Sequence, residues 1–127
     1  MSLDRRILIA DDDADLRAGF ADLVDGLGVE VLEAENGETA LAIVQRERLD
    51  LAVLDMHMPD LTGMDVLEGI RALHFDLPCI FCSGQAEDGV LEMARQRGAN
   101  AVFRKPVEPL VLRGEMLRLL GIRLGDR

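Results

Sequence analysis

The stretch Leu51-Ala52-Val53-Leu54-Asp55-Met56-His57-Met58-Pro59 decides the fold of this chain. Its first four residues are all apolar, which is typical of a strand buried on both faces, because a half-exposed strand alternates apolar and polar residues. Proline lacks a backbone donor, so Met58-Pro59 ends the strand. We therefore expect a central strand that carries the carboxylate of Asp55 at its C-terminal end.

Short apolar runs alternate with segments of helical period along the rest of the chain. The expected strands are residues 6–10, 29–32, 51–54, 78–82 and 101–103. Apolar residues spaced three and four apart predict helices around residues 16–27, 40–44, 66–73, 90–94 and 108–120. We expect the last helix to pack on the sheet through Leu110, Leu117 and Leu120. The alternation predicts an α/β fold, a doubly wound five-stranded parallel sheet with five helices on its two faces.

The length and charge of the chain restrict its functions. The 127 residues suit one domain, with a core at about residues 5–120, a leader at 1–3 and a tail or the start of a linker at 121–127. The 24 acidic residues outnumber the 14 basic ones and give a formal net charge of -10. We therefore expect no direct contact with nucleic acid, which needs a basic surface, and none with a membrane of anionic lipid.

The apolar runs indicate a cytoplasmic protein, and the cysteine spacing indicates buried thiols. Runs such as residues 7–10 are far shorter than the ~20 residues that cross a bilayer, and no secretion signal opens the chain. Cys79 and Cys82 lie on one expected strand, where residues three apart point to opposite faces. We expect two buried thiols there, with neither a disulfide nor a shared metal.

Polar residues follow four of the expected strands at their C-terminal ends. They are Asp11, Asp12 and Asp13 after the first strand, Asp55 after the third, Ser83 after the fourth and Lys105 after the fifth. Parallel strands bring these side chains to the edge of the sheet where ligands of such folds bind. Clustered carboxylates repel one another, and Mg²⁺ is their natural partner. A metal, a lysine and a hydroxyl that converge on Asp55 describe a phosphoryl-transfer site with this carboxylate as nucleophile.

Four stretches of the chain resemble one family, the receiver domains of two-component response regulators. The stretches are I-L-I-A-D-D-D at residues 7–13, L-A-V-L-D-M-H-M-P-D-L-T-G-M at 51–64, C-S-G at 82–84 and F-R-K-P at 103–106. Their order and spacing agree with the family over almost the whole chain. The resemblance implies the flavodoxin-like three-layer sandwich of the chemotaxis regulators, with the strand order 2-1-3-4-5.

The resemblance also assigns an acceptor and a metal site. It implies that Asp55 takes a phosphoryl group from the phosphohistidine of a sensor histidine kinase or a phosphotransfer protein. Mg²⁺ would be bound directly by Asp12 and partly through water by Asp11. Asp55 itself and the backbone carbonyl of His57 would complete the protein ligands.

Three further residues have roles that the resemblance implies. Ser83 would reorient toward the phosphoryl oxygen, Lys105 would form an ion pair with the phosphoryl group, and the peptide bond before Pro106 would be cis. We add the hypothesis that the side chains of His57 and Gln85 tune how fast water reaches the phosphoryl group.

Other polar residues near the site are expected to have structural roles. Asp13 or Asp15 suits the cap of the first helix, because a carboxylate accepts hydrogen bonds from the free backbone N–H groups at a helix start. Asp60 and Thr62 are interpreted as loop and cap residues.

One departure from the family concerns the output of the domain. The family commonly carries an aromatic residue three positions before the lysine, where this chain has Val102. Phe103 lies beside it and points to the opposite face of the strand, so it cannot substitute. We expect phosphorylation to switch the face formed by residues 90–94, 101–103 and 108–120. An effector domain, a downstream protein or a second copy in a homodimer would bind there.

Two alternative functions stay open on sequence alone. A Mg²⁺-dependent aspartyl-phosphate phosphatase shares the nucleophile, but it carries a second acid two residues later, where this chain has His57. A pseudo-receiver interaction module, not controlled by phosphorylation, would not need the intact set of site residues. We expect no enzyme activity beyond the domain's own phosphorylation and dephosphorylation.

Overall fold

The computed structural model describes residues 5–74, 76–84 and 89–124. Its strands are β1 (Arg5–Ala10), β2 (Val29–Ala34), β3 (Leu51–Asp55), β4 (Cys79–Ser83) and β5 (Ala101–Arg104). They form a parallel sheet in the order β2-β1-β3-β4-β5, with β3 in the centre. The expected strand order and parallel pairing are confirmed.

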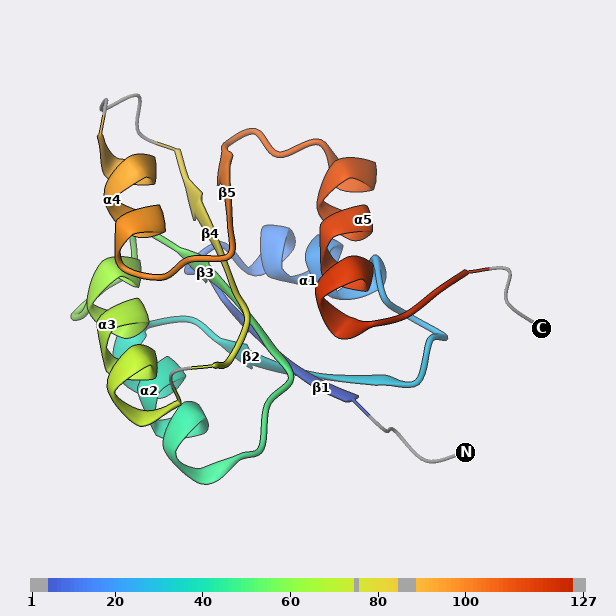
Figure 1. The fold of residues 1–127 in the computed structure, drawn as a ribbon, viewed down its shortest axis with the longest axis horizontal. Helices are drawn as coiled ribbons and strands as arrows, with labels where there is room; N and C mark the ends of the chain where they lie inside the picture. The colour runs from blue at the N-terminus through green and yellow to red at the C-terminus, as the bar shows by residue number, and fades with distance from the viewer. Residues whose placement is uncertain (1–4, 75, 85–88, 125–127) are drawn as a thin grey trace.

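The helices cover both faces of this sheet (Figure 1). They are α1 (Ala14–Asp22), α2 (Gly37–Arg46), α3 (Gly63–Leu73), α4 (Val90–Gln96) and α5 (Pro109–Leu120). α1 and α5 pack on one face, and α2, α3 and α4 pack on the other. The result is the three-layer sandwich that the alternation and the resemblance predicted.

The central strand β3 is buried along its whole length, as its apolar run predicted. Leu51 and Val53 belong to the core cluster under α1 and α5. Ala52 and Leu54 belong to the cluster under α2, α3 and α4. Because successive strand residues point to opposite faces, one apolar run supplies both cores. The carboxylate that ends this strand is therefore held on an element that is buried on both faces.

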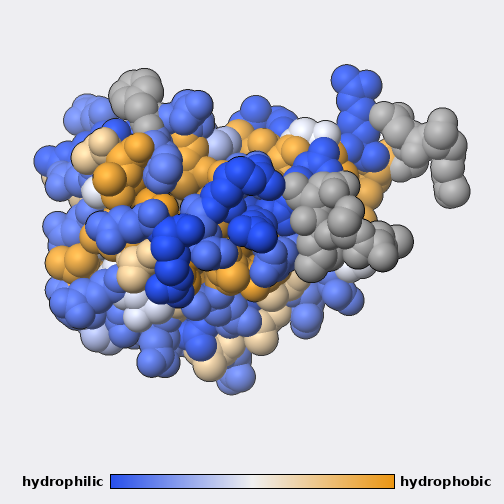
Figure 2. Space-filling view, turned by 90° about the horizontal axis from the view of Figure 1, so that it is seen from below, coloured by the Kyte–Doolittle hydropathy of each residue, from blue (hydrophilic) through white to orange (hydrophobic). Residues whose placement is uncertain are grey.

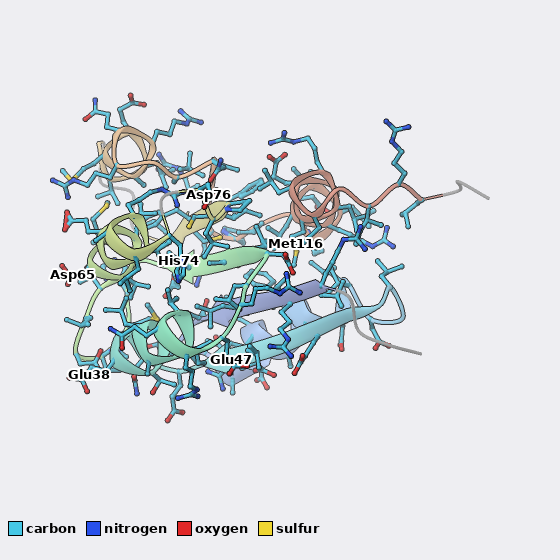
Figure 3. The ribbon with its side chains drawn as sticks, turned by 60° about the horizontal axis from the view of Figure 1, so that its bottom comes forward. Glu38, Glu47, Asp65, His74, Asp76 and Met116 are labelled. Carbon is cyan, nitrogen blue, oxygen red and sulfur yellow. The ribbon has the colours of Figure 1, made fainter. Side chains whose placement is uncertain are left out.

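Polar side chains accept hydrogen bonds from free N–H groups at the starts of four helices, and Glu108 is the cap of α5. Asp13 caps α1 and Asn36 caps α2. Thr62 caps α3 in a capping box with Asp65, which confirms its interpretation as a cap residue. Figure 3 shows Glu38 and Asp65, the acidic first-turn residues of α2 and α3, at the same end of the two helices. Negative charge at this end is favoured by the helix dipole.

The first helix is shorter than its apolar spacing predicted. α1 ends at Asp22, and Leu23 is its C-cap. The backbone beyond it makes tighter bonds to the third residue back, such as Val24 N–H to Ala21 C=O at 3.2 Å, and then turns at Gly26 with φ 79°. Apolar residues after the helix still reach the core in this tighter turn, so helical spacing persists where the α-helix does not.

The interpretation of the last helix was wrong at one residue. Leu120 is buried in the core cluster that includes the sheet, as expected, and Leu117 is also buried, but the side chain of Leu110 is 73% exposed. Leu112, two residues later, is fully buried. Residues two apart on a helix point about 200° away from each other, so burial of Leu112 turns Leu110 toward solvent.

Two pairs of residues lie on opposite faces of the sheet, as their spacing predicted. Cys79 is buried in the cluster under α2, α3 and α4, whereas Cys82 is buried in the cluster under α1 and α5. Val102 and Phe103 divide between the same two clusters. Phe103 therefore does not take the place of an aromatic residue at position 102.

On the face shown in Figure 2, hydrophobic residues form patches that hydrophilic residues separate. None of the helices among the described residues is both long and apolar enough to cross a membrane.

The two cysteines provide a test of this core. Burial raises the pKa of the Cys79 thiol to about 11 and that of Cys82 to about 12. Because the thiolate is the reactive form, we expect an alkylating reagent at about pH 8 to leave the native chain unmodified and to label both cysteines in urea. Intact mass measures both results. Rapid labelling of the native chain would contradict the described packing.

Candidate functional site

The strand register brings the predicted site residues together. Ala10 pairs with Leu54, so the residues that follow them, Asp11 and Asp55, stand side by side at the C-terminal ends of β1 and β3. Asp55 in turn pairs with Cys82 on β4. The structure thus places both carboxylates at the edge of the sheet predicted from the sequence.

Lys105 connects these two carboxylates. Its Nζ lies 2.7 Å from Asp11 Oδ2 and 2.8 Å from Asp55 Oδ1. The carboxylates belong to residues that are only 1% and 4% exposed. The peptide bond between Lys105 and Pro106 is cis, as the resemblance implied. One ammonium group therefore neutralises part of the negative charge that the sheet edge collects.

Burial and charge act in opposite directions on this group of residues. Burial raises the pKa of the Asp55 carboxyl, the hydrogen bond from Lys105 lowers it, and the charge of Asp11 raises it again, so that the pKa lies above its ordinary value. Burial tends to lower the pKa of Lys105, but the two carboxylates outweigh this effect and raise it. Lys105 is therefore a permanent cation at neutral pH.

The acidic residues of the site fit a divalent cation. Asp11, Asp12 and Asp55 each offer a carboxylate oxygen, and these oxygens lie within 4.8 Å of one another. Asp12 is exposed, so a cation can reach the cluster from solvent. Hard oxygen ligands of this kind suit Mg²⁺, which commonly keeps several waters. The donor set therefore matches the metal that the sequence predicted.

The start of α3 fixes the backbone of Asp55 from behind. A Cβ atom on Gly63 would lie 2.2 Å from the Asp55 carbonyl oxygen, so only glycine allows this approach. Gly63 N–H also donates to the Met56 carbonyl at 2.9 Å. The first helical residue after the loop thus rests directly on the residue that carries the carboxylate.

The loop between β3 and α3 is also tied to the start of α2. Asp60 Oδ1 accepts hydrogen bonds from the N–H groups of Gly37 and Glu38 at 3.0 and 3.2 Å. Asp60 adopts φ 67°, in the left-handed region that short polar residues tolerate. Its interpretation as a loop residue is confirmed, and its carboxylate additionally caps a second helix.

The other predicted site residues lie around this centre. Ser83 is fully buried as the last residue of β4, rather than in the turn after the strand. Its carbonyl accepts a hydrogen bond from Lys105 N–H at 2.9 Å. His57 is exposed in the loop after β3. Gln85 lies outside the described residues.

Sequence reasoning missed Arg17, which also reaches the site. Its Nη1 donates to the backbone carbonyl of Asp11 at 2.6 Å. Arg17 stands one helical turn after the cap residue Asp13, a position from which a long side chain can fold back over the end of β1. The position of Arg17 four residues after Asp13 is the one feature of the sequence that could have indicated this contact, and many surface arginines have such a position.

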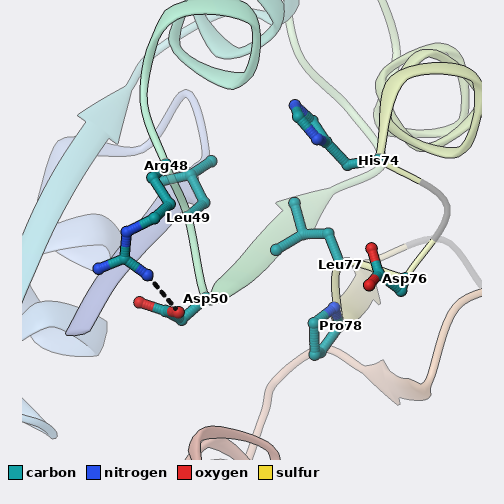
Figure 4. A pocket seen from close by; sticks show the side chains of 7 residues that line it. All are labelled: Arg48, Leu49, Asp50, His74, Asp76, Leu77 and Pro78. Atoms are coloured by element: carbon teal, nitrogen blue, oxygen red, sulfur yellow. Dashed lines mark hydrogen bonds and ion pairs between the residues drawn. The ribbon is translucent and has the colours of Figure 1, made fainter.

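A pocket lies at the opposite edge of the sheet (Figure 4). It has a volume of about 270 Å³ and is lined by Arg48, Leu49, Asp50, His74, Asp76, Leu77 and Pro78. Asp50 and Pro78 directly precede β3 and β4, so this pocket is at the N-terminal ends of the strands. It is therefore separate from the carboxylate cluster.

Comparison with known proteins identifies the family. The family model for the response regulator receiver domain matches residues 7–116. This chain belongs to that family. It is a receiver domain of the two-component response regulators, and neither of the two alternative functions is favoured by the comparisons.

Several relatives differ in how much of their length the receiver domain occupies. A response regulator receiver protein of Anaeromyxobacter is 36% identical over 103 residues, which cover 81% of this chain but only 43% of that protein. Sporulation initiation phosphotransferase F of Bacillus subtilis is 27% identical over 121 residues, which cover 95% of this chain and 98% of that protein.

A solved structure supports the same fold. The crystal structure of a CheY-like receiver domain protein from Methanospirillum hungatei superimposes with a TM-score of 0.86 at 30% identity. The superposition covers 92% of this chain and 94% of the Methanospirillum chain.

The contact between Gly63 and Asp55 yields a prediction. We expect Gly63→Ala to lower the free energy of unfolding by about 1–3 kcal/mol, because the added methyl group meets backbone that cannot move aside easily. Urea denaturation measures the change. Gly114→Ala on α5 is the control, since nothing lies within 4 Å of its Cβ position. We expect that control to gain about 0.5–1 kcal/mol. Equal stability of the two variants would contradict the close approach at Gly63.

Proposed function

We propose that Asp55 is the phosphoacceptor of this receiver domain and that Mg²⁺ is its cofactor. The observation that carries this proposal is the Lys105 ammonium, which lies between the carboxylates of Asp11 and Asp55. A carboxylate that receives a phosphoryl group needs cations at hand, because transfer of this group depends on charge neutralisation and positioning.

The transfer forms one bond and breaks one. An Asp55 carboxylate oxygen attacks the phosphorus of a phosphohistidine, the new P–O bond forms, and the P–N bond breaks. The imidazole leaves with the electron pair of the broken bond and takes a proton from water. Asp11, Asp12 and Asp55, together with the carbonyl of His57, would hold Mg²⁺, which would supply positive charge beside the acceptor carboxylate.

Two residues stabilise the product. Lys105 is already within 2.8 Å of Asp55, so its ammonium needs only a small shift to pair with a phosphoryl oxygen. Ser83 supplies a hydroxyl from the adjacent strand β4. Neither residue changes its covalent state, and both act through position and charge.

The donor is a sensor histidine kinase or a phosphotransfer protein. A groove of about 400 Å³ opens beside the site and is lined by Leu16, Phe20, Gly84, Lys105, Pro106 and Val107. Its lining is mostly apolar, and Lys105 stands at its edge. A partner that packs on this groove brings its phosphohistidine next to Asp55.

The output leaves through α4, β5 and α5. Lys105 directly follows β5, so a shift of its side chain acts on this strand first. An effector domain, a downstream protein or a second copy of the chain binds the switched face, and the domain acts in the cytoplasm.

Intact mass after incubation with Mg²⁺ and a small phosphodonor tests the acceptor. We expect one phosphoryl adduct on the unaltered chain and none on Asp55→Asn, because the amide is not a nucleophile for phosphorus. Asp76→Asn is the matched control: Asp76 lines the pocket at the opposite edge of the sheet, so the adduct should persist there.

The same experiment separates the alternatives. Absence of the adduct with both the small donor and a purified kinase would favour a pseudo-receiver. Repeated turnover of added phosphomonoesters would favour a phosphatase. An adduct that survives in Asp55→Asn would place the acceptor at another residue.

A further inference from the structure

Arg17 makes an unusual set of contacts for a residue on an outer helix. Its side chain is only 13% exposed. Nη1 donates to the backbone carbonyl of Asp11 at 2.6 Å, and Nε pairs with Glu33 Oε1 at 3.0 Å. One guanidinium group thus connects α1 with the C-terminal ends of β1 and β2, directly beside the carboxylate cluster.

The contact from Arg17 completes the fixation of Asp11. The backbone N–H of Asp11 donates to the Ala34 carbonyl at 3.0 Å. Its Oδ1 accepts from Asp13 N–H at 2.9 Å, and its Oδ2 accepts from Lys105 Nζ at 2.7 Å. With Arg17 on the carbonyl, all four polar groups of this residue are held. Asp12 follows in the chain, so its direction depends on the same anchor.

The charge of Arg17 raises a difficulty that Glu33 resolves. A bare guanidinium next to three carboxylates would compete with a divalent cation for their negative charge. Glu33 pairs with this guanidinium and cancels its charge locally. Lys105 differs in this respect, because it contacts the carboxylates themselves. The Arg17–Glu33 pair can therefore orient backbone without occupying the site.

We infer that the Arg17–Glu33 pair is a positioning device for the metal site. Arg17 holds the Asp11 carbonyl so that Asp11 and Asp12 face the cation, and Glu33 keeps the Arg17 charge from weakening cation binding. This inference rests on the metal site of the proposed function. It assigns the pair no contact with the phosphoryl group.

Titration calorimetry of the full chain with Mg²⁺ alone tests the role of Arg17. We expect Arg17→Met to weaken Mg²⁺ binding by about tenfold or more, which is the usual effect of removing a residue that orients metal ligands. The Mg²⁺ affinity of Arg17→Lys should fall between those of the unaltered chain and Arg17→Met, because an ammonium can reach either the Asp11 carbonyl or Glu33 but cannot bridge them. Arg17→Lys also tests the inference if Arg17→Met does not fold.

Arg71→Met is the matched control for a general loss of stability. Arg71 likewise holds backbone carbonyls, those of Gly98 and Leu77, but at the opposite edge of the sheet. We expect this variant to unfold at lower urea concentration with unchanged Mg²⁺ affinity. Equal weakening of Mg²⁺ binding in both variants would overturn the inference, because loosening of the whole fold would then explain it.

Glu33→Gln tests the pairing itself. In the unaltered background this change should weaken Mg²⁺ binding, because it leaves the guanidinium charge uncompensated. In the Arg17→Met background it should have no further effect. A loss of the same size in both backgrounds would indicate a direct charge effect of Glu33 and overturn the coupling.

The results also separate this inference from the proposed function. If the chain forms the Asp55 adduct but Arg17→Met binds Mg²⁺ as tightly as before, only the positioning role fails. If the Mg²⁺ affinities change as expected but no adduct forms with any donor, only the acceptor proposal fails. If the unaltered chain does not bind Mg²⁺, the positioning role is overturned together with the metal site.

Discussion

The structure depends on one ammonium group between two buried carboxylates. Lys105 Nζ lies within 2.8 Å of both Asp11 and Asp55, which are almost completely shielded from water. Two such charges ~4 Å apart would repel by about 4 kcal/mol at an effective dielectric of 20, so a cation must lie near both. Because these residues belong to the ends of β1, β3 and β5, the contact also ties three strands at one edge. The same Lys105 contacts therefore neutralise charge in the site and hold the ends of the three strands together.

Contacts outside this triad hold its members in register. Gly63 lets the start of α3 rest on the Asp55 backbone, and Asp60 fastens the intervening loop to the start of α2. Arg17 performs the corresponding task at the end of β1. Each contact is to main chain rather than to a reacting oxygen. These three contacts thus fix the loops around the site without using a carboxylate oxygen of Asp11 or Asp55.

Sequence reasoning succeeds where one residue type has one physical use and fails where a contact has no local pattern. The apolar run before Asp55 requires a buried strand, and parallel strands bring Lys105 to the same edge, so the centre of the site was predictable. The end of α1 was not predictable, because the tighter turn after Asp22 keeps apolar residues near the core at the spacing that an α-helix would have. The role of Arg17 was hidden for another reason. Its target is a backbone carbonyl, which no side-chain pattern records.

The same charge balance explains why phosphorylation of Asp55 would change the output face. A phosphoryl group adds negative charge where one ammonium already serves two carboxylates, so Lys105 cannot keep all of its present contacts. Lys105 directly follows Arg104, the last residue of β5, which pairs with Ser83 on β4. A change in the contacts of Lys105 therefore acts on the end of β5. Val102, two residues before Arg104 on β5, is a small side chain that packs under α2, α3 and α4. We therefore expect the backbone of β5, rather than the rotation of a large ring at position 102, to carry the change toward α4 and α5.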